Sequence, residues 1–156
     1  MIAGFRNEYY FLSNFYICNI NYNGKTYQSA EAAFQAQKSL DENIQWQFTG
    51  LSPRDARTQG KRVPLRPDWE EVKEDIMKEI LIIKFSKPEL KEKLLETGDE
   101  FLEETNGWHD NHWGNCNCER CRNIPGKNML GNLLMDVRKN FQEEIFRNEN
   151  PPYMQC

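Results

Sequence analysis

The stretch YICNINYNGKTYQSAEAAFQAQKSL, residues 16–40, carries the signals that decide the fold. Its first half alternates apolar residues with asparagines and then reaches Asn23-Gly24, a dipeptide favoured in type I′ turns. This pattern predicts a β-hairpin over residues 16–27. In the second half the alternation gives way to an alanine-rich segment, which predicts a helix over residues 29–40.

Helical patterns dominate the rest of the chain. Serine caps, apolar residues at helical spacing and glycine stops predict four more helices, within residues 52–60, 69–85, 87–98 and 128–146. We expect the last helix to turn five apolar residues inward: Leu130, Leu134, Val137, Phe141 and Ile145. The sequence therefore predicts an α+β fold, mostly helical with a small antiparallel β-sheet, as a single domain over residues 1–147. Residues 148–156 are expected to form a flexible C-terminal tail.

Charge and cysteine content narrow the class of protein. The net charge of -4 and the pI near 5.3 argue against stable nucleic-acid binding, which needs clustered Lys and Arg. The sequence has neither a signal-peptide pattern nor an apolar run long enough to span a membrane, so a cytoplasmic protein is expected. Five cysteines, three of them close together, are not typical of a disulfide framework and favour a reducing compartment. The oligomeric state is not predicted.

Three polar side chains share one face of the helix predicted over residues 29–40. Glu31, Gln35 and Lys38 are four and then three residues apart, and the residues between them are mostly alanines. A solvated helix face is one interpretation. The other is a reactive site, because a buried carboxylate can transfer protons and a desolvated amine becomes a nucleophile.

The irregular segment 105–127 contains both histidines and three of the five cysteines. Cys116, Cys118 and Cys121, with His112 as fourth ligand, could bind a structural zinc ion, since Cys and His bind zinc tetrahedrally. The competing interpretation is reduced loop cysteines without a ligand. No other cofactor is expected.

Further candidates concern phosphate and planar ligands. The start of the last helix, around Gly126 and Asn128, can attract an anion through its N–H groups. A basic run lies earlier in the chain and could bind the same phosphates, or could simply be solvated: Arg57, Lys61, Arg62 and Arg66. Two tryptophans, Trp69 and Trp113, could either pack in the core or stack on a planar ligand. Trp113 is followed by Gly114.

Six motifs, taken together and in order, resemble the NADAR (YbiA-like) family. They are FLSNFY, YQSAEAAFQAQK, SPRDARTQG, LRPDWEEVKEDIM, HDNHWG and GKNMLGNLLMDVR, and the resemblance runs from about Leu12 to Arg138. The resemblance implies a mostly helical α+β domain with N-glycosidase activity. Family members remove ADP-ribose from modified guanine bases or hydrolyse the N-glycosidic bond of early riboflavin-pathway intermediates.

The resemblance also implies roles for individual residues. It places the catalytic carboxylates at Glu31 and Asp110, the reactive amine at Lys38 and the active-site tryptophan at Trp69. Residues expected to contact the substrate with Trp69 are Asn14, Phe15, Gln35, Arg57, Arg66, Trp113, Gly114, Gly126 and Asn128.

Two departures from the family pattern affect these expectations. Many members have Ser-Glu-His-Tyr where this chain has residues 30–33, Ala-Glu-Ala-Ala, so substrate preference can differ. The segment NCNCERCRNIP, residues 115–125, is longer than in compact members.

Two rival functions are a non-catalytic ADP-ribose reader and a zinc-stapled interaction domain.

Overall fold

The structure, a computed structural model, describes residues 1–154 and forms two compact units. One unit runs from Phe5 to Leu90. The other combines residues 1–4 with the chain from Lys91 onward, so the division falls within helix α5 (Pro88–Glu96). The content is mostly helical with small sheets, which confirms the predicted α+β class. Within the described residues, no helix is both long and apolar enough to cross a lipid bilayer. The boundary at residue 147 stays a prediction.

The predicted hairpin is confirmed. Strands β2 (Ile17–Tyr22) and β3 (Lys25–Ser29) pair antiparallel, with Ile20 opposite Tyr27. Asn23 and Gly24 connect them with φ values of 50° and 80°. Two successive positive φ angles are the signature of a type I′ turn. Ile20 and Tyr27 are buried, so one face of the hairpin contributes to the core.

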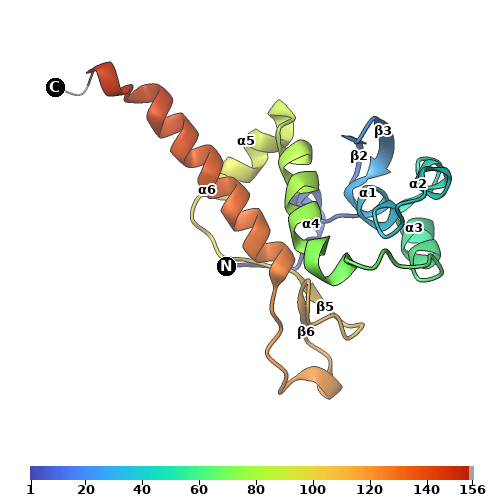
Figure 1. The fold of residues 1–156 in the computed structure, drawn as a ribbon. Coiled ribbons are helices and arrows are strands. Elements are labelled where there is room, and N and C mark those ends of the chain that lie inside the picture. The colour runs from blue at the N-terminus through green and yellow to red at the C-terminus, as the bar shows by residue number, and fades with distance from the viewer. Residues whose placement is uncertain (155–156) are drawn as a thin grey trace. The chain divides into compact units, whose positions relative to one another are not determined.

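Four helices and one 3₁₀ helix surround this hairpin in the Phe5–Leu90 unit. They are η1 (Asn7–Leu12), α1 (Ala30–Ala36), α2 (Glu42–Phe48), α3 (Pro53–Gly60) and α4 (Trp69–Phe85). Figure 1 shows α1 next to the hairpin, with α2 and α3 beside it. The limits predicted for α3 and α4 are confirmed. The hydroxyl oxygens of Ser29 and Ser52 accept hydrogen bonds at the starts of α1 and α3, as their positions predict.

The helix predicted over residues 29–40 is shorter than expected. Helix α1 ends at Ala36, and the next three N–H groups donate to carbonyls three residues back instead of four. Ser39 instead makes hydrogen bonds at the start of α2. Its Oγ accepts from the N–H of Asp41, and its carbonyl accepts from the side-chain amide of Gln45. Lys38 therefore lies in a tight turn after α1, which corrects the prediction of a continuous helical face.

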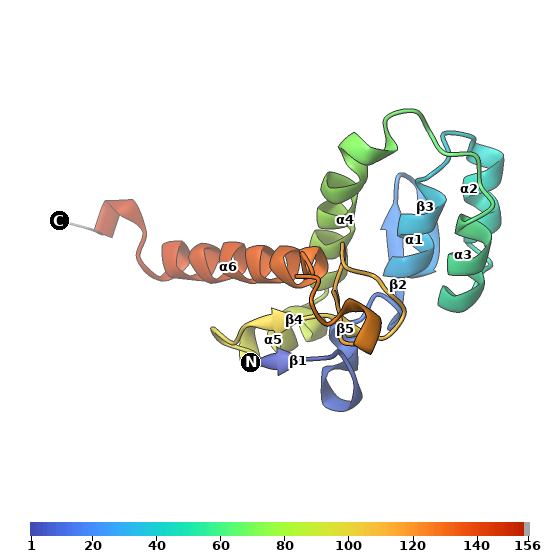
Figure 2. The same ribbon diagram turned by 90° about the horizontal axis from the view of Figure 1, so that it is seen from below.

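The other unit is built around α6 (Met129–Glu149) and short strand pairs. Strands β1 (Ile2–Ala3) and β4 (Leu102–Glu103) pair in parallel, as Figure 2 shows near the N-terminus. The remaining elements are α5 from Lys91 onward, β5 (Thr105–Asn106), β6 (Asn115–Cys116), η2 (Glu119–Cys121) and η3 (Pro152–Met154). Strands β5 and β6 are also parallel, so within residues 1–154 only the hairpin matches the antiparallel sheet predicted from sequence.

Helix α6 confirms four of the five residues predicted to face inward. Leu130, Leu134, Val137 and Phe141 are buried, whereas Ile145 is 36% exposed and that prediction is wrong. The helix continues two residues beyond 147, and η3 follows it. Residues 155 and 156 of the predicted tail lie outside the described part of the chain.

Candidate active site around Glu31

Glu31 lies in the first turn of α1, and the residue is 6% exposed. The side-chain amide of Gln35, one turn later, donates to Glu31 Oε1 over 2.9 Å. The Nε of Arg57, on α3, lies 3.5 Å from the same oxygen. Both partners are donors, so one oxygen of the buried carboxylate faces an amide N–H and a guanidinium N–H. Arg57 is itself 39% exposed, so this ion pair connects a buried acid to the surface.

Small residues let α3 approach α1 at this point. The alanines of α1 are fully buried, and a Cβ at Gly60 would lie 1.9 Å from Oε1 of Gln35. The carbonyl of Gly60 also accepts a hydrogen bond from Lys38 Nζ over 3.4 Å. Gly60 was predicted only as a helix stop. In the structure it makes room for Gln35 and holds Lys38, a role that a helix-stop pattern cannot reveal.

The Lys38 amine is half-buried, and its pKa is lowered from the ordinary lysine value. The largest cause is desolvation of the ammonium form, and the nearby cations Lys61 and Lys73 lower the pKa further. The negative charge of Glu31 acts in the opposite direction. A lysine in this environment loses its proton more easily than one in water, which favours nucleophilic chemistry.

Two buried oxygen atoms near this group accept no hydrogen bond among the described residues. They are Oδ1 of Asn14 and Oε1 of Gln35. Asn14 is tied to α1 by its backbone, because its carbonyl accepts from the N–H of Glu31 over 3.0 Å. The guanidinium of Arg57 lies 4.4 Å above the ring of Phe15. Buried acceptors of this kind can be satisfied by hydroxyl or amino groups of a ligand.

Trp69 and Arg66 are engaged in protein contacts. Trp69 is 6% exposed and packs on Phe34 with ring centroids 5.0 Å apart. Arg66 makes two hydrogen bonds to Asp68, of 2.6 and 3.0 Å, and its backbone N–H donates to the Lys38 carbonyl. A phosphate at Arg66 would compete with Asp68, so the phosphate-binding role assigned to Arg57 and Arg66 stays a prediction.

Asp110 belongs to the unit that follows Lys91, where it closes a tight turn. Its Oδ1 accepts from the backbone N–H groups of His112 and Trp113, over 3.1 and 2.9 Å. Its own N–H donates to the side chain of Asn106, whose amide donates back to the Asp110 carbonyl. Asn106 is 1% exposed and was not predicted to contribute.

The residues around the start of α6 are also engaged within the protein. The N–H groups of residues 127–130 donate to carbonyls of residues 111–114, and the N–H of Gly126 donates to the Asn115 side chain. Asn128 bridges Leu102 and Glu104 with its amide. An anion at this helix start would compete with these bonds, so the substrate contacts assigned to Gly126 and Asn128 stay predictions.

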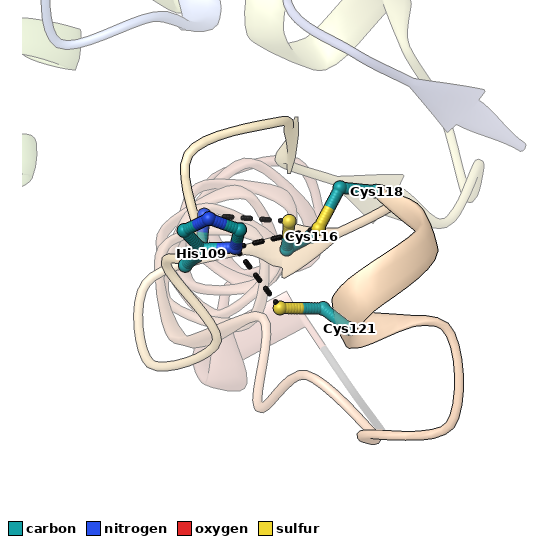
Figure 3. Close-up of side chains that lie close together, drawn as sticks. All are labelled: His109, Cys116, Cys118 and Cys121. Atoms are coloured by element: carbon teal, nitrogen blue, oxygen red, sulfur yellow. Dashed lines mark hydrogen bonds between the residues drawn. The ribbon is translucent and has the colours of Figure 1, made fainter.

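The loop cysteines gather around a different histidine from the one expected. Nδ1 of His109 lies 3.3 Å from the sulfurs of both Cys118 and Cys121, and the His109 N–H donates to Cys116 (Figure 3). His112 instead packs edge-on against Trp113, with ring centroids 4.8 Å apart. The prediction that His112 completes this group is therefore wrong. His109, whose φ is 71°, is the histidine whose ring lies within 4.8 Å of the three sulfurs.

Comparison with known proteins identifies relatives along most of the chain. The family model of the NADAR domain matches residues 4–142. The protein named N-glycosidase YbiA of Shigella boydii is 39% identical over 137 residues, covering 85% of this chain and 82% of the relative. A protein of Vibrio vulnificus named for riboflavin biosynthesis is 35% identical, but the match covers 36% of that longer protein. The NMR structure of Escherichia coli YbiA superposes with a TM-score of 0.78 at 35% identity, covering 93% of this chain and 88% of that structure.

Proposed function

This chain belongs to the NADAR domain family, and from that premise we propose that it is an N-glycosidase acting on a phosphorylated ribosyl compound. The observation that carries the proposal is the pairing of a buried carboxylate, Glu31, with a lysine whose pKa is lowered, Lys38. An acid–base group and a nucleophilic amine are what cleavage at a sugar C1–N bond requires. Homologues named N-glycosidases support the reaction class.

The first step is attack by Lys38 on C1 of the ribose. Glu31, ionised next to Gln35 and Arg57, takes a proton from the Lys38 ammonium and leaves a neutral amine. The amine forms a bond to C1 while the electron pair of the C1–N bond moves to the leaving base. Glu31 then returns its proton to that nitrogen, so the carboxylate is regenerated as the base departs.

The second step releases the sugar with water. The ring oxygen of the lysine-bound sugar takes up the proton that the attached nitrogen loses, which opens the ring to an iminium ion. Water adds to C1, and the bond to Lys38 breaks with a proton returning to the amine. Asp110 is assigned to stabilising positive charge at C1 or orienting this water, a role that rests on the family pattern.

The first proposed substrate is ADP-ribosyl guanine in nucleic acid, with free ADP-ribose as the product. The acidic net charge of -4 favours a single-stranded or terminal base over a tightly bound duplex.

An early riboflavin-pathway intermediate is the second candidate. It is favoured by the Vibrio vulnificus relative, whose name refers to riboflavin biosynthesis. Both substrates have a phosphorylated ribose joined to nitrogen through C1, so one reaction scheme serves both.

The test is product release from both substrates. Purified protein is incubated with a single-stranded oligonucleotide carrying ADP-ribosyl guanine, and separately with riboflavin-pathway intermediates, and the freed sugar phosphate is quantified by mass spectrometry. Glu31→Gln should lower turnover by about 10²-fold or more, while Glu89→Gln, an exposed carboxylate on α5, should not change it.

Borohydride reduction tests the covalent step separately. It should leave a sugar adduct on the wild type and none on Lys38→Ala. Trapping that persists in Lys38→Ala would refute the covalent route. Binding of ADP-ribose with no release from either substrate would instead support the non-catalytic reader.

A further inference from the structure

The strongest feature outside the Glu31 group is the cluster of one imidazole and three thiols in the segment 105–127. The ligand atoms of His109, Cys116, Cys118 and Cys121 all lie within 4.8 Å of one another. None of the three cysteines forms a disulfide. Figure 3 shows the imidazole directed at the sulfurs, which come from strand β6 and from the two ends of η2.

The spacing of these atoms fits a tetrahedral zinc ion. Zinc binds sulfur at about 2.3 Å and imidazole nitrogen at about 2.0 to 2.1 Å, so neighbouring ligand atoms lie roughly 3.5 to 3.8 Å apart. The two distances from His109 Nδ1 to sulfur are 3.3 Å each, slightly shorter than in such a tetrahedron. The group as a whole extends to 4.8 Å, so an ion at the centre requires some ligand atoms to move slightly outward and others to move inward by about 1 Å.

The backbone of His109, within the cluster, has an energetically unfavourable conformation. His109 has a φ of 71°, and for a residue with a Cβ this left-handed conformation costs roughly 1–2 kcal/mol. Thiol groups are weak hydrogen-bond donors and acceptors, so their contacts with the imidazole offset little of this cost. Such strain persists where surrounding interactions hold the residue in place, and four metal–ligand bonds would supply them.

The segment also has little apolar packing of its own. Its buried residues are Asn106, Gly114, Cys116 and Cys121, none of which is a large apolar side chain. Its regular structure amounts to two-residue strand pairs and the single turn η2. Segments with so small a core are commonly held together by a metal or by disulfides.

We propose that His109, Cys116, Cys118 and Cys121 bind one Zn²⁺ ion as a structural site. Each thiol loses its proton to solvent on binding, and His109 coordinates through Nδ1 as a neutral ring. All four positions are occupied by protein ligands, so the ion has no open position for water or substrate. The backbone N–H of His109 donates to Cys116 over 3.3 Å and supports the negative charge of that thiolate.

The zinc ion would fix the conformation of the turn that carries Asp110. Asp110 directly follows His109, and both Asp110 and Trp108 donate backbone N–H bonds to Asn106. Anchoring His109 therefore limits the movement of Asp110 from one side, while Asn106 limits it from the other. This consequence for activity rests on the proposed glycosidase function, whereas the metal site itself does not.

The test is metal content, measured independently of activity. Tag-free protein is purified under reducing conditions, reconstituted with zinc, dialysed and analysed by inductively coupled plasma mass spectrometry. We expect one zinc per chain in the wild type and less than a tenth of that in Cys116→Ser and Cys121→Ser. Cys18→Ser, which alters a cysteine of strand β2, and His112→Ala should both retain full zinc.

Variants at His109 identify the fourth ligand. His109→Cys should keep one zinc, because a fourth thiolate replaces the imidazole, and His109→Ala should bind zinc more than about tenfold more weakly. If cysteine variants fail to fold, the Co²⁺-substituted wild type decides the question by its visible spectrum. Tetrahedral thiolate bands support the site. A zinc-free wild type after reconstitution, octahedral cobalt, or zinc loss in His112→Ala but not in His109→Ala would overturn it.

Glycosidase assays of the same preparations separate the two proposals. A zinc-bound wild type without turnover would contradict the proposed function and leave the metal site intact. A wild type that stays zinc-free after reconstitution but shows full turnover would contradict the metal site and leave the proposed function intact.

Discussion

At the scale of single residues, the charge of Glu31 is one of the influences on the pKa of Lys38. Burial lowers the pKa of Lys38, and the Glu31 carboxylate opposes this shift by stabilising the ammonium form. Glu31→Gln removes the negative charge while keeping the shape of the side chain. We therefore predict that the pKa of Lys38 falls further in this variant, measured by NMR titration of isotope-labelled lysine.

Glu89→Gln serves as the control for this titration and should leave the Lys38 pKa unchanged. A Lys38 pKa that rises in Glu31→Gln, or stays the same, would show that the two side chains do not interact as described. Because this measurement needs no substrate, it tests the site without assuming the reaction.

Some contacts around Glu31 follow from the sequence, whereas others depend on tertiary packing. Glu31 and Gln35 interact as their spacing predicts, because both lie within a helical turn of α1. Gly60 was missed because its role depends on the packing of α3 against α1, which no local pattern contains. His109 was missed for a different reason, because spacing in the sequence alone could not choose between it and His112 as the histidine beside the three cysteines.

At the scale of elements, α3 can approach α1 closely because Gly60 has no side chain. In Gly60→Ala the new Cβ would overlap Gln35 Oε1, so the amide must move away from Glu31. We predict a loss of roughly 1–3 kcal/mol in the free energy of unfolding and at least a tenfold drop in glycosidase turnover. Chemical denaturation and the product-release assay measure the two effects.

Gly50→Ala is the matched control, because the nearest atom to its added Cβ is 3.9 Å away. It should fold and act like the wild type. Equal stability and equal turnover for Gly60→Ala and Gly50→Ala would contradict the tight α1–α3 contact.

The buried cap of α1 gives a second prediction at this scale. Ser29 is fully buried, and its Oγ accepts from the N–H of Ala32 over 3.1 Å. Ser29→Ala leaves that donor buried without an acceptor, so we predict a loss of about 1–2 kcal/mol in urea unfolding. Ser52→Ala removes the corresponding cap of α3 at a half-buried position, where water can replace it, and should cost less. Identical losses would argue against burial as the cause.

Elements defined by local signals were predictable, whereas pairings between distant segments were not. The limits of α3 and α4 follow from a serine–proline start and from apolar spacing, and both are confirmed. Helix α2 was missed, and its start after Asp41 explains why the helix predicted to reach Leu40 ends early. The parallel pair β1–β4 joins Ile2 to Leu102, and two-residue strands leave no periodicity to detect.

At the scale of the whole molecule, the buried lysine Lys84 makes stability depend on pH. Its amine is fully buried near the end of α4 and donates to the Ser13 carbonyl over 2.8 Å. Burial lowers its pKa to about 8, and Cys18 acts in the opposite direction. In an unfolded chain the value is about 10.4.

Between pH 8 and 10 the unfolded chain therefore binds more protons at Lys84 than the folded protein does, so stability rises with pH in this range. Below pH 8 both states hold the proton and the full cost of burying the charge is present. We predict that the unfolding free energy of the wild type, relative to Lys84→Met, increases by roughly 1–3 kcal/mol from pH 7.5 to pH 10. Urea unfolding at both pH values measures the difference.

Lys87→Met, three residues further along and only half-buried, controls for the loss of a positive charge in this region. Its stability difference from the wild type should vary much less with pH. A wild-type advantage over Lys84→Met that is constant or shrinks with rising pH would rule out the buried ammonium as the cause.

The parallel pairing of β1 with β4 bears on how the chain is made. Ile2 leaves the ribosome 100 residues before its partner Leu102, a delay of roughly 5–20 s at ordinary translation rates. Phe5–Leu90 is complete before Leu102 is made and its own strand pair is local, so we expect it to fold first. Protease treatment of nascent chains stalled at successive lengths would reveal this order. Residues 2–3 would then reach their final place only after residues 5–90, which are synthesised after them, have folded.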